Sequence, residues 1–219
     1  MTTTRFTPRV CATEAKAAMR RVRAYVGLGA NVGDPAATLA GAVHALGALP
    51  GARLRGVSRL YATRPVGVED QPDFRNAVVA LDVPAGADPA SGAIALLVAL
   101  KALERAFGRL RQKRWGPREL DLDLLVFGRS SIEVERPPEG VSLDPGKAGH
   151  LLVVPHRDAA ERLFVLAPLA DLAPGLVPPG WWHSVDWSRR RRELVEGPDA
   201  VRAIAKWDQT GGGWAELRP

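Results

Sequence analysis

The sequence predicts an α+β sandwich, in which one sheet has helices packed on it. Short apolar runs of the kind that form strands are interleaved with segments whose apolar residues recur at helical spacing. The chain has 219 residues and is 46% hydrophobic and 25% charged, a balance typical of a globular protein with a sizeable core. We therefore expect one domain of ordinary size, or a compact domain with an appended tail.

The first predicted unit is a strand followed by a helix. Residues 25–29 form a short apolar strand that enters a turn at residues 30–33. Asp34 and Pro35 favour a helix start, because an aspartate can cap the first turn and proline suits the first helical position. Apolar residues at helical spacing continue this helix until a Pro–Gly pair ends it: Leu39, Val43, Leu46 and Leu49, then Pro50 and Gly51.

Two further strands and a second helix follow. Residues 53–61 and 77–83 are predicted strands, joined by a loop rich in proline, glycine and aspartate. Asp88 and Pro89 begin the second helix, and Gly108 ends it. Its apolar residues mark one face: Leu96, Leu100, Leu103 and Phe107.

The last predicted elements are a strand at residues 120–127 and a third helix. Asp158 with Glu161 three positions later resembles a capping box that opens this helix. Between the two elements, proline and glycine make residues 137–149 an expected exposed excursion. Towards the C-terminus the pattern weakens, and residues 188–207 are expected to form one or two short basic helices.

This pattern divides the chain into three parts. Residues 1–22 are expected to be a flexible extension, residues 23–175 the folded domain with a loop insertion at residues 137–150, and residues 176–219 a basic, tryptophan-rich extension. The last part contains the arginine run 189–192. Such a tail could bind nucleic acid by stacking and charge, or it could pack on the domain's own surface, which we favour.

Composition and charge limit the classes of function. A net charge of +6 and a pI near 10.1 indicate an anionic partner, such as nucleic acid, anionic lipid or a phosphorylated small molecule. The longest apolar stretch, residues 93–100, is far shorter than the roughly 20 residues of a membrane-spanning helix. The single cysteine, Cys11, excludes an internal disulfide and fits a reducing cytoplasm.

Residues 105–118 concentrate positive charge. They contain six basic side chains and no acidic one: Arg105, Arg109, Arg111, Lys113, Arg114 and Arg118. A solvated basic loop is the plainer interpretation. The alternative is a clamp for phosphate, because guanidinium groups bind phosphate oxygens in a bidentate manner.

Two aspartates occupy alternate positions of the strand that follows. Asp121 and Asp123 face one side of it, with Cα atoms about 7 Å apart. The opposite face is apolar: Leu120, Leu122, Leu124 and Val126. Such a pair could be an exposed polar face on an edge strand, or hard oxygen ligands for Mg²⁺. Beside the arginine-rich loop, the pair favours a metal-bound polyphosphate substrate, although the usual dinucleotide, P-loop and protein-kinase motifs are absent from the sequence.

Four collinear blocks resemble the 6-hydroxymethyl-7,8-dihydropterin pyrophosphokinase family of folate biosynthesis. They are AYVGLGANVGDP (24–35), YATRPVGVEDQPDFRNAVVAL (61–81), RWGPRELDLDLLVFG (114–128) and VPHRDAAERLFVLAPLADLAP (154–174). The resemblance implies a ferredoxin-like α/β sandwich with a mainly antiparallel sheet. It also implies transfer of pyrophosphate from ATP to the pterin, giving the pterin diphosphate and AMP, by metal-assisted in-line attack of the pterin hydroxyl on the β-phosphorus.

The resemblance assigns roles on the nucleotide side of the reaction. Asp121 and Asp123 match the ligands of two Mg²⁺ ions. Residues that match the catalytic phosphate clamp and its closing loop are Arg109, Arg111, Trp115 and Arg118. Residues that match contacts to ATP are Glu104, Arg109, Arg118, His156 and Arg162. Without the resemblance, His156 would be a buried structural residue and Glu104 a solvated residue at a helix end.

The resemblance also assigns a pterin site. Phe74 and Phe164 match an aromatic pair that sandwiches the ring, and Asn76 matches the side chain that reads its hydrogen-bonding edge. Residues of a neighbouring loop match its backbone contacts: Thr63, Pro65 and Val66. Core packing is the alternative interpretation of the two phenylalanines.

Two other functions compete with an active enzyme. A nucleic-acid-binding protein would use the basic loop and the tail, but it has no use for the paired aspartates. An inactive relative kept for binding is the other alternative, although both aspartates are present. We expect a cytoplasmic monomer that uses ATP and the pterin, with no nucleic-acid or membrane partner.

Overall fold

A computed structural model describes residues 20–64, 72–108, 118–141 and 151–217 of the chain. Within them, a seven-stranded antiparallel sheet has the order β5-β1-β4-β3-β8-β9, and β2 also pairs with β4. Its strands are β1 (Arg21–Ala30), β2 (Arg53–Val57), β3 (Leu60–Thr63), β4 (Phe74–Pro84), β5 (Asp121–Phe127), β8 (Val201–Asp208) and β9 (Gly213–Glu216). A separate two-stranded sheet joins β6 (Ile132–Glu135) to β7 (Leu151–Val154). The predicted α+β fold with an antiparallel sheet is confirmed.

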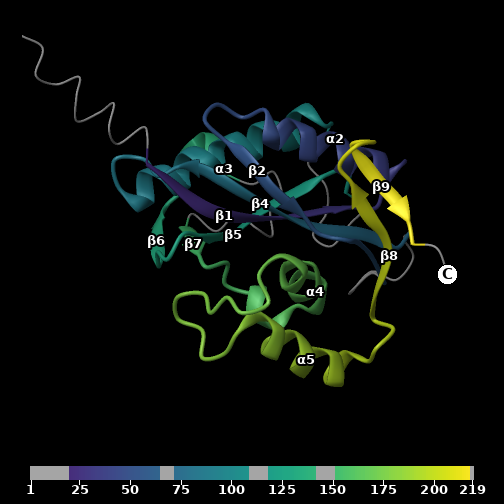
Figure 1. Cartoon of the computed structure of the whole chain (residues 1–219). Coiled ribbons are helices and arrows are strands. Elements are labelled where there is room, and N and C mark those ends of the chain that lie inside the picture. The colour runs from purple at the N-terminus through teal and green to yellow at the C-terminus, as the bar shows by residue number, and fades with distance from the viewer. Residues whose placement is uncertain (1–19, 65–71, 109–117, 142–150, 218–219) are drawn as a thin grey trace, which may run out of the picture.

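Helices cover both faces of the main sheet (Figure 1). One face carries α2 (Pro35–Gly47) and α3 (Pro89–Ala106), and the other carries α4 (Leu163–Leu172), with α5 (Val185–Glu196) packed on α4. We call these the α2/α3 face and the α4 face. Each has its own apolar cluster, the larger one lying under α2 and α3.

The predicted starts of the first two helices are confirmed. Asp34 caps α2 by accepting a hydrogen bond from the Ala37 N–H at 3.0 Å. Asp88 caps α3 in the same way, in a capping box with Ser91. The second helix is followed by Gly108, whose φ of +84° lies in the left-handed region that glycine tolerates.

The strand predicted at residues 53–61 is two strands, β2 and β3, which pair end to end with different parts of β4. The strand is interrupted at Ser58, whose hydroxyl accepts a hydrogen bond from the Val78 N–H at 2.9 Å. A side chain thus takes the place of a backbone acceptor between the two strands.

The prediction that Val126 shares a face with the leucines of β5 is wrong. The register between β1 and β5 shifts so that Tyr25 faces Val126 and Val26 faces Leu124, which leaves Leu125 as the extra residue of a bulge. Leu125 and Val126 therefore both join the apolar cluster of the α4 face. Leu120, Leu122 and Leu124 lie in the cluster of the α2/α3 face, as predicted.

Two expectations for residues 137–161 are also corrected. Asp158 makes no capping hydrogen bond; it precedes a short 3-10 helix, and α4 begins only at Leu163. The Asp158 carboxylate pairs with Arg162 instead. The excursion is not exposed throughout, because Gly140 is buried under Leu97 of α3, while residues 142–150 lie outside the described residues.

The C-terminal residues join the main sheet. The expected helices at residues 188–207 are only partly present, since α5 is followed by β8, which pairs with β3. The rings of Trp207 and Trp214 meet edge to face with centroids 4.8 Å apart, and the Trp214 indole N–H donates to the Ser58 carbonyl at 3.0 Å. In the described residues the tail thus packs on the domain's own surface. None of the helices in these ranges has the length and apolar character of a membrane-spanning segment.

Candidate active site

The two aspartates of β5 lie on the α4 face of the sheet at its edge. Asp121 is opposite Gly29 of β1 and Asp123 is opposite Gly27, so no side chain of β1 stands beside either carboxylate. Leu122, between them, is fully buried on the other face. The predicted arrangement of two carboxylates on one face, backed by leucines, is therefore present.

A row across three strands connects Asp121 to the residues that match the pterin site. In this row Gly29 faces Asp121 on one side and Asn76 of β4 on the other. A methyl group at Gly29 would lie only 3.1 Å from the Asn76 Oδ1 atom, so glycine leaves room for the amide. The Asn76 amide in turn donates to the Thr63 hydroxyl at 2.7 Å, and both side chains are buried.

The two phenylalanines belong to elements that pack together. Phe74 begins β4, and Phe164 lies in the first turn of α4, which packs on β4. The Arg162 guanidinium lies over the Phe164 ring at 5.8 Å from its centroid. Neither phenylalanine belongs to the buried core, which weakens the interpretation that they serve packing alone. Pro65 and Val66 lie outside the described residues.

Asn31 ties together the chain segments that border the site. Its backbone N–H donates to the Arg118 carbonyl at 3.0 Å, and its side-chain oxygen accepts from the Arg118 N–H at 2.7 Å. Its amide also donates to the Pro72 carbonyl at 3.1 Å. The Arg118 guanidinium pairs with Asp121. The other predicted residues of the phosphate clamp lie outside the described residues: Arg109, Arg111 and Trp115.

His156 is placed by the bulge of β5. Its backbone N–H donates to the Leu125 carbonyl at 2.8 Å. The imidazole Nδ1 atom accepts from the Asp158 N–H at 3.3 Å, which leaves Nε2 to carry the proton in the neutral ring. The His156 side chain is only partly buried, which does not fit the interpretation of a buried structural residue.

Glu104 is not a solvated residue at a helix end, because it is only 2% exposed. Its Oε1 atom accepts from the Lys101 ammonium at 2.6 Å and from the Leu122 N–H at 2.7 Å. Lys101, also buried, donates to the Leu122 carbonyl at 2.9 Å. This carboxylate therefore meets β5 at the residue between Asp121 and Asp123.

Sequence reasoning missed Lys101 and Arg136. Burial lowers the pKa of the Arg136 guanidinium, while the negative charges of Asp123 and Glu104 act in the opposite direction. Arg136 also donates from Nε to the Leu151 carbonyl at 2.9 Å. The sequence around Arg136 gives no indication that this side chain comes near Asp123 and Glu104. It directly follows β6, which pairs only with β7 in a separate small sheet among the described residues.

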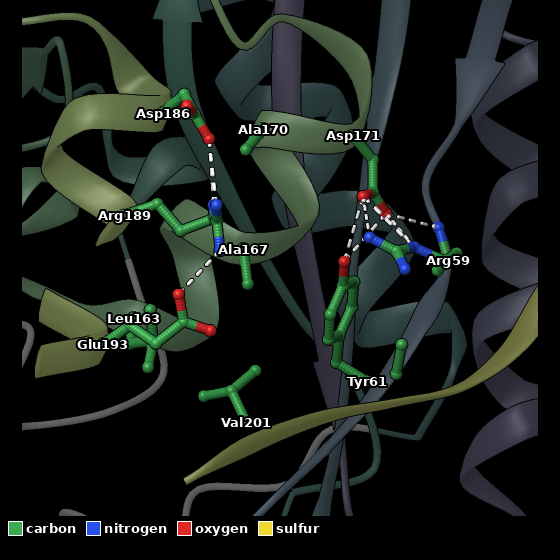
Figure 2. A pocket seen from close by; sticks show the side chains of 11 residues that line it. Arg59, Tyr61, Leu163, Ala167, Ala170, Asp171, Asp186, Arg189, Glu193 and Val201 are labelled. Carbon is green, nitrogen blue, oxygen red and sulfur yellow. Dashed lines mark hydrogen bonds and ion pairs between the residues drawn. The ribbon is translucent and has the colours of Figure 1, made fainter. Parts of the chain in front are cut away.

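A hollow of about 390 Å³ lies between α4, α5, β3 and β8 (Figure 2). On one side the Asp171 carboxylate accepts from the Tyr61 hydroxyl at 3.0 Å and from the Arg59 guanidinium. On the other side Arg189 bridges Asp186 and Glu193. Burial, followed by the charge of Asp171, raises the pKa of the Tyr61 phenol. Of the predicted site residues that the structure describes, none lines this hollow.

The donor set is suited to a phosphate-bound Mg²⁺ rather than to a closed protein cage. Within the described ranges, no group of three or more histidine, cysteine, aspartate or glutamate side chains converges on one point. Mg²⁺ is commonly held by one or two carboxylates together with substrate phosphate oxygens and water. Two carboxylates on one sheet face, with Arg118 paired to Asp121 and Arg136 within reach of the charge of Asp123, are suited to binding a metal-bound phosphate group.

The 7,8-dihydro-6-hydroxymethylpterin-pyrophosphokinase family model matches residues 25–174. The chain belongs to this family. Enzymes named 2-amino-4-hydroxy-6-hydroxymethyldihydropteridine pyrophosphokinase resemble it closely. One from Methylorubrum extorquens is 44% identical over 193 residues, covering 86% of this chain and 96% of the relative. Another, from Pseudomonas aeruginosa, is 42% identical over 161 residues, covering 74% and 86%.

Solved structures support the same fold. The crystal structure of wild-type Plasmodium falciparum HPPK-DHPS with pteroate matches with a TM-score of 0.66 and 14% identity, covering 90% of this chain. This chain spans about half the length of that protein, with 48% of it covered. The family's activity is transfer of a pyrophosphoryl group from ATP to hydroxymethyldihydropterin in folate biosynthesis, and it is the activity of this chain.

Proposed function

We propose that the reaction takes place on the α4 face of the sheet, where the row from Asp121 through Gly29 to Asn76 joins the nucleotide side to the pterin side. This row is the observation that carries the proposal. It puts a phosphate-directed carboxylate and a heterocycle-directed amide on neighbouring strands, so the two substrates would meet across β1. Such positioning of two bound reactants is a major source of rate enhancement.

Asp121 and Asp123 would hold two Mg²⁺ ions. When bound, the ions would neutralise phosphate charge and favour in-line attack of the pterin hydroxyl on the β-phosphorus. The two carboxylates would supply some of the oxygen ligands, and phosphate oxygens and water the rest. We assign no protein base, because the bound ions would activate the pterin hydroxyl themselves.

Arginine side chains would hold the triphosphate. Arg118 pairs with Asp121, and Arg136 lies within reach of the charge of Asp123. His156 is held at the bulge of β5, and Arg162 follows it in the chain. Arg109 and Arg111 would add to this clamp, and Trp115 would help to close the site. Exclusion of water by such a closure would strengthen every charge interaction with ATP.

The pterin would lie at the ends of β3 and β4. Asn76, buried and hydrogen-bonded to Thr63, would present its remaining amide groups to the edge of the ring. Phe74 and Phe164 would stack on the ring, and Pro65 and Val66 would offer backbone contacts. A flat polar heterocycle fits such a site, since stacking supplies affinity and a few fixed polar groups supply specificity.

The test is release of AMP from ATP, Mg²⁺ and 6-hydroxymethyl-7,8-dihydropterin by the purified chain. Asp121→Asn and Asp123→Asn are expected to lower turnover at least about 10³-fold while pterin binding stays within about twofold. Asp199→Asn, at an exposed loop position, is the matched control with wild-type turnover. Equal losses of turnover and of pterin affinity in the two β5 variants would contradict the metal role.

We also infer that the enzyme works as a cytoplasmic monomer without a nucleic-acid partner. The one cysteine fits a reducing compartment, and the C-terminal tail, which could have bound nucleic acid, pairs in its described part with β3 of the domain's own sheet. Analytical ultracentrifugation with and without both substrates tests the oligomeric state, and a dimer at working concentration would contradict it.

A further inference from the structure

The edge of the main sheet at β5 has a buried ion pair where a further strand would lie. Within the described residues β5 is the terminal strand in the order of the sheet, so the outward N–H and C=O groups of Leu122, its second residue, have no neighbouring strand to bond. At Leu122 both groups are nevertheless satisfied. The N–H donates to Glu104 at 2.7 Å and the C=O accepts from Lys101 at 2.9 Å.

The two charged groups are in direct contact and are almost inaccessible to water. The Lys101 ammonium and the Glu104 carboxylate lie 2.6 Å apart, with side chains 3% and 2% exposed. They are three residues apart on α3, so one helix supplies both a donor and an acceptor. A buried ion pair is costly to desolvate, and it offers little stability over an apolar pair unless further hydrogen bonds compensate. Here those bonds are made to Leu122.

The held residue lies between the two proposed metal ligands. Successive residues of a strand direct their backbone groups to opposite sides, so Asp121 and Asp123 direct theirs to β1 when Leu122 directs its own to α3. The backbone is then fixed from both edges over three consecutive residues. Their side chains alternate as well, and both carboxylates are turned to the α4 face.

We propose that Lys101 and Glu104 are positioning residues for the carboxylates of Asp121 and Asp123, acting through the backbone of Leu122. This inference rests on the metal role given to the two aspartates. It gives Glu104 a part in the reaction that needs no direct contact with ATP, and it explains why a charged pair is kept inside an otherwise leucine-rich contact between α3 and β5.

Three variants separate positioning from simple stability. Glu104→Leu removes both the acceptor of the Leu122 N–H and the charge that balances Lys101. Glu104→Gln is the conservative variant, because its amide oxygen can still accept from the Leu122 N–H and from Lys101. Leu97→Ala is the control on the same helix: it opens a cavity in the core at a side chain that makes none of the hydrogen bonds to Leu122.

Metal binding is measured without turnover, by electron paramagnetic resonance of Mn²⁺ in the presence of a non-hydrolysable ATP analogue. Glu104→Leu is expected to weaken Mn²⁺ binding about tenfold or more, the usual effect of removing a group that orients a metal ligand. Glu104→Gln and Leu97→Ala are expected to stay within about threefold of wild type, although Leu97→Ala lowers the melting temperature. Pterin affinity should be unchanged in all three.

The inference is overturned if Glu104→Leu binds Mn²⁺ like wild type while it melts earlier, since the role of Glu104 would then be structural alone. If Glu104→Leu does not fold, Lys101→Met removes the donor to Leu122 and must give the same weakening. A wild-type chain that binds Mn²⁺ with the nucleotide but releases no AMP would contradict the proposed function and leave this comparison decisive.

Discussion

Asn31 and Arg118 bind each other reciprocally, with the Asn31 N–H on the Arg118 carbonyl at 3.0 Å and the Arg118 N–H on the Asn31 side-chain oxygen at 2.7 Å. The pair joins the end of β1 to the end of the basic loop, 87 residues further along the chain. Since the Arg118 guanidinium contacts Asp121, this backbone link also determines where the arginine enters the site.

Asn31→Ala is therefore expected to raise the activation free energy of turnover by more than it lowers the free energy of unfolding. It leaves the Arg118 N–H and the Pro72 carbonyl without these partners, at a cost of about 1–3 kcal/mol for each group that stays buried. Asn31→Asp keeps the acceptor for Arg118 and should retain more activity than the alanine variant. Steady-state kinetics and urea unfolding measure the two effects, and wild-type turnover in Asn31→Ala would refute the link.

Gly29→Ala is expected to weaken pterin binding. The added methyl group would lie 3.1 Å from the Asn76 Oδ1 atom and would displace the amide from the position in which it bonds Thr63, a crowding cost of about 1–3 kcal/mol. Gly175→Ala is the matched control, because nothing lies within 4 Å of its added methyl group. Pterin affinity is measured by fluorescence titration, and equal affinities for the two variants would show that Asn76 does not read the ring.

The Asp171–Tyr61 contact predicts how stability depends on alkaline pH. Because the pKa of Tyr61 is raised in the folded state, the folded chain keeps its proton at pH values where the unfolded chain, with a pKa of about 10, has lost it. The free energy of unfolding should therefore be level with respect to this group below about pH 10 and fall above it. Tyr61→Phe should flatten that fall. Urea unfolding between pH 8 and about 11 makes the measurement, and identical slopes in the wild type and in Tyr61→Phe would exclude Tyr61 as its source.

Trp214 and Trp182 should differ sharply in their effect on stability. Trp214 packs on Trp207 and bonds Ser58, so Trp214→Ala is expected to cost about 3 kcal/mol or more. Trp182 is 93% exposed, and Trp182→Ala should change stability by less than about 0.5 kcal/mol. Thermal unfolding distinguishes them. A small effect at Trp214 would mean that the β8–β9 hairpin contributes little to the sheet.

Local sequence patterns correctly predicted features of both the fold and the site. Asp34 and Asp88 are read as helix caps because capping depends only on residues a few positions apart, and both caps are present. Asp121 and Asp123 are read as sharing a face because side chains on a strand alternate with a period of two. The same local pattern, joined to a resemblance in four blocks, was enough to indicate the family.

Contacts between distant segments were decided only by the tertiary structure. The bulge at Leu125 reverses the alternation at Val126 and turns a carbonyl towards His156, and it arises from pairing with β1, about a hundred positions earlier. Glu104 looks like a solvated helix residue until β5 is laid beside α3. The tail becomes strands because β3 has a free edge for β8 to pair with. Periodicity fixes which way a side chain points relative to its own element, whereas the energy of burial and pairing depends on which element lies opposite.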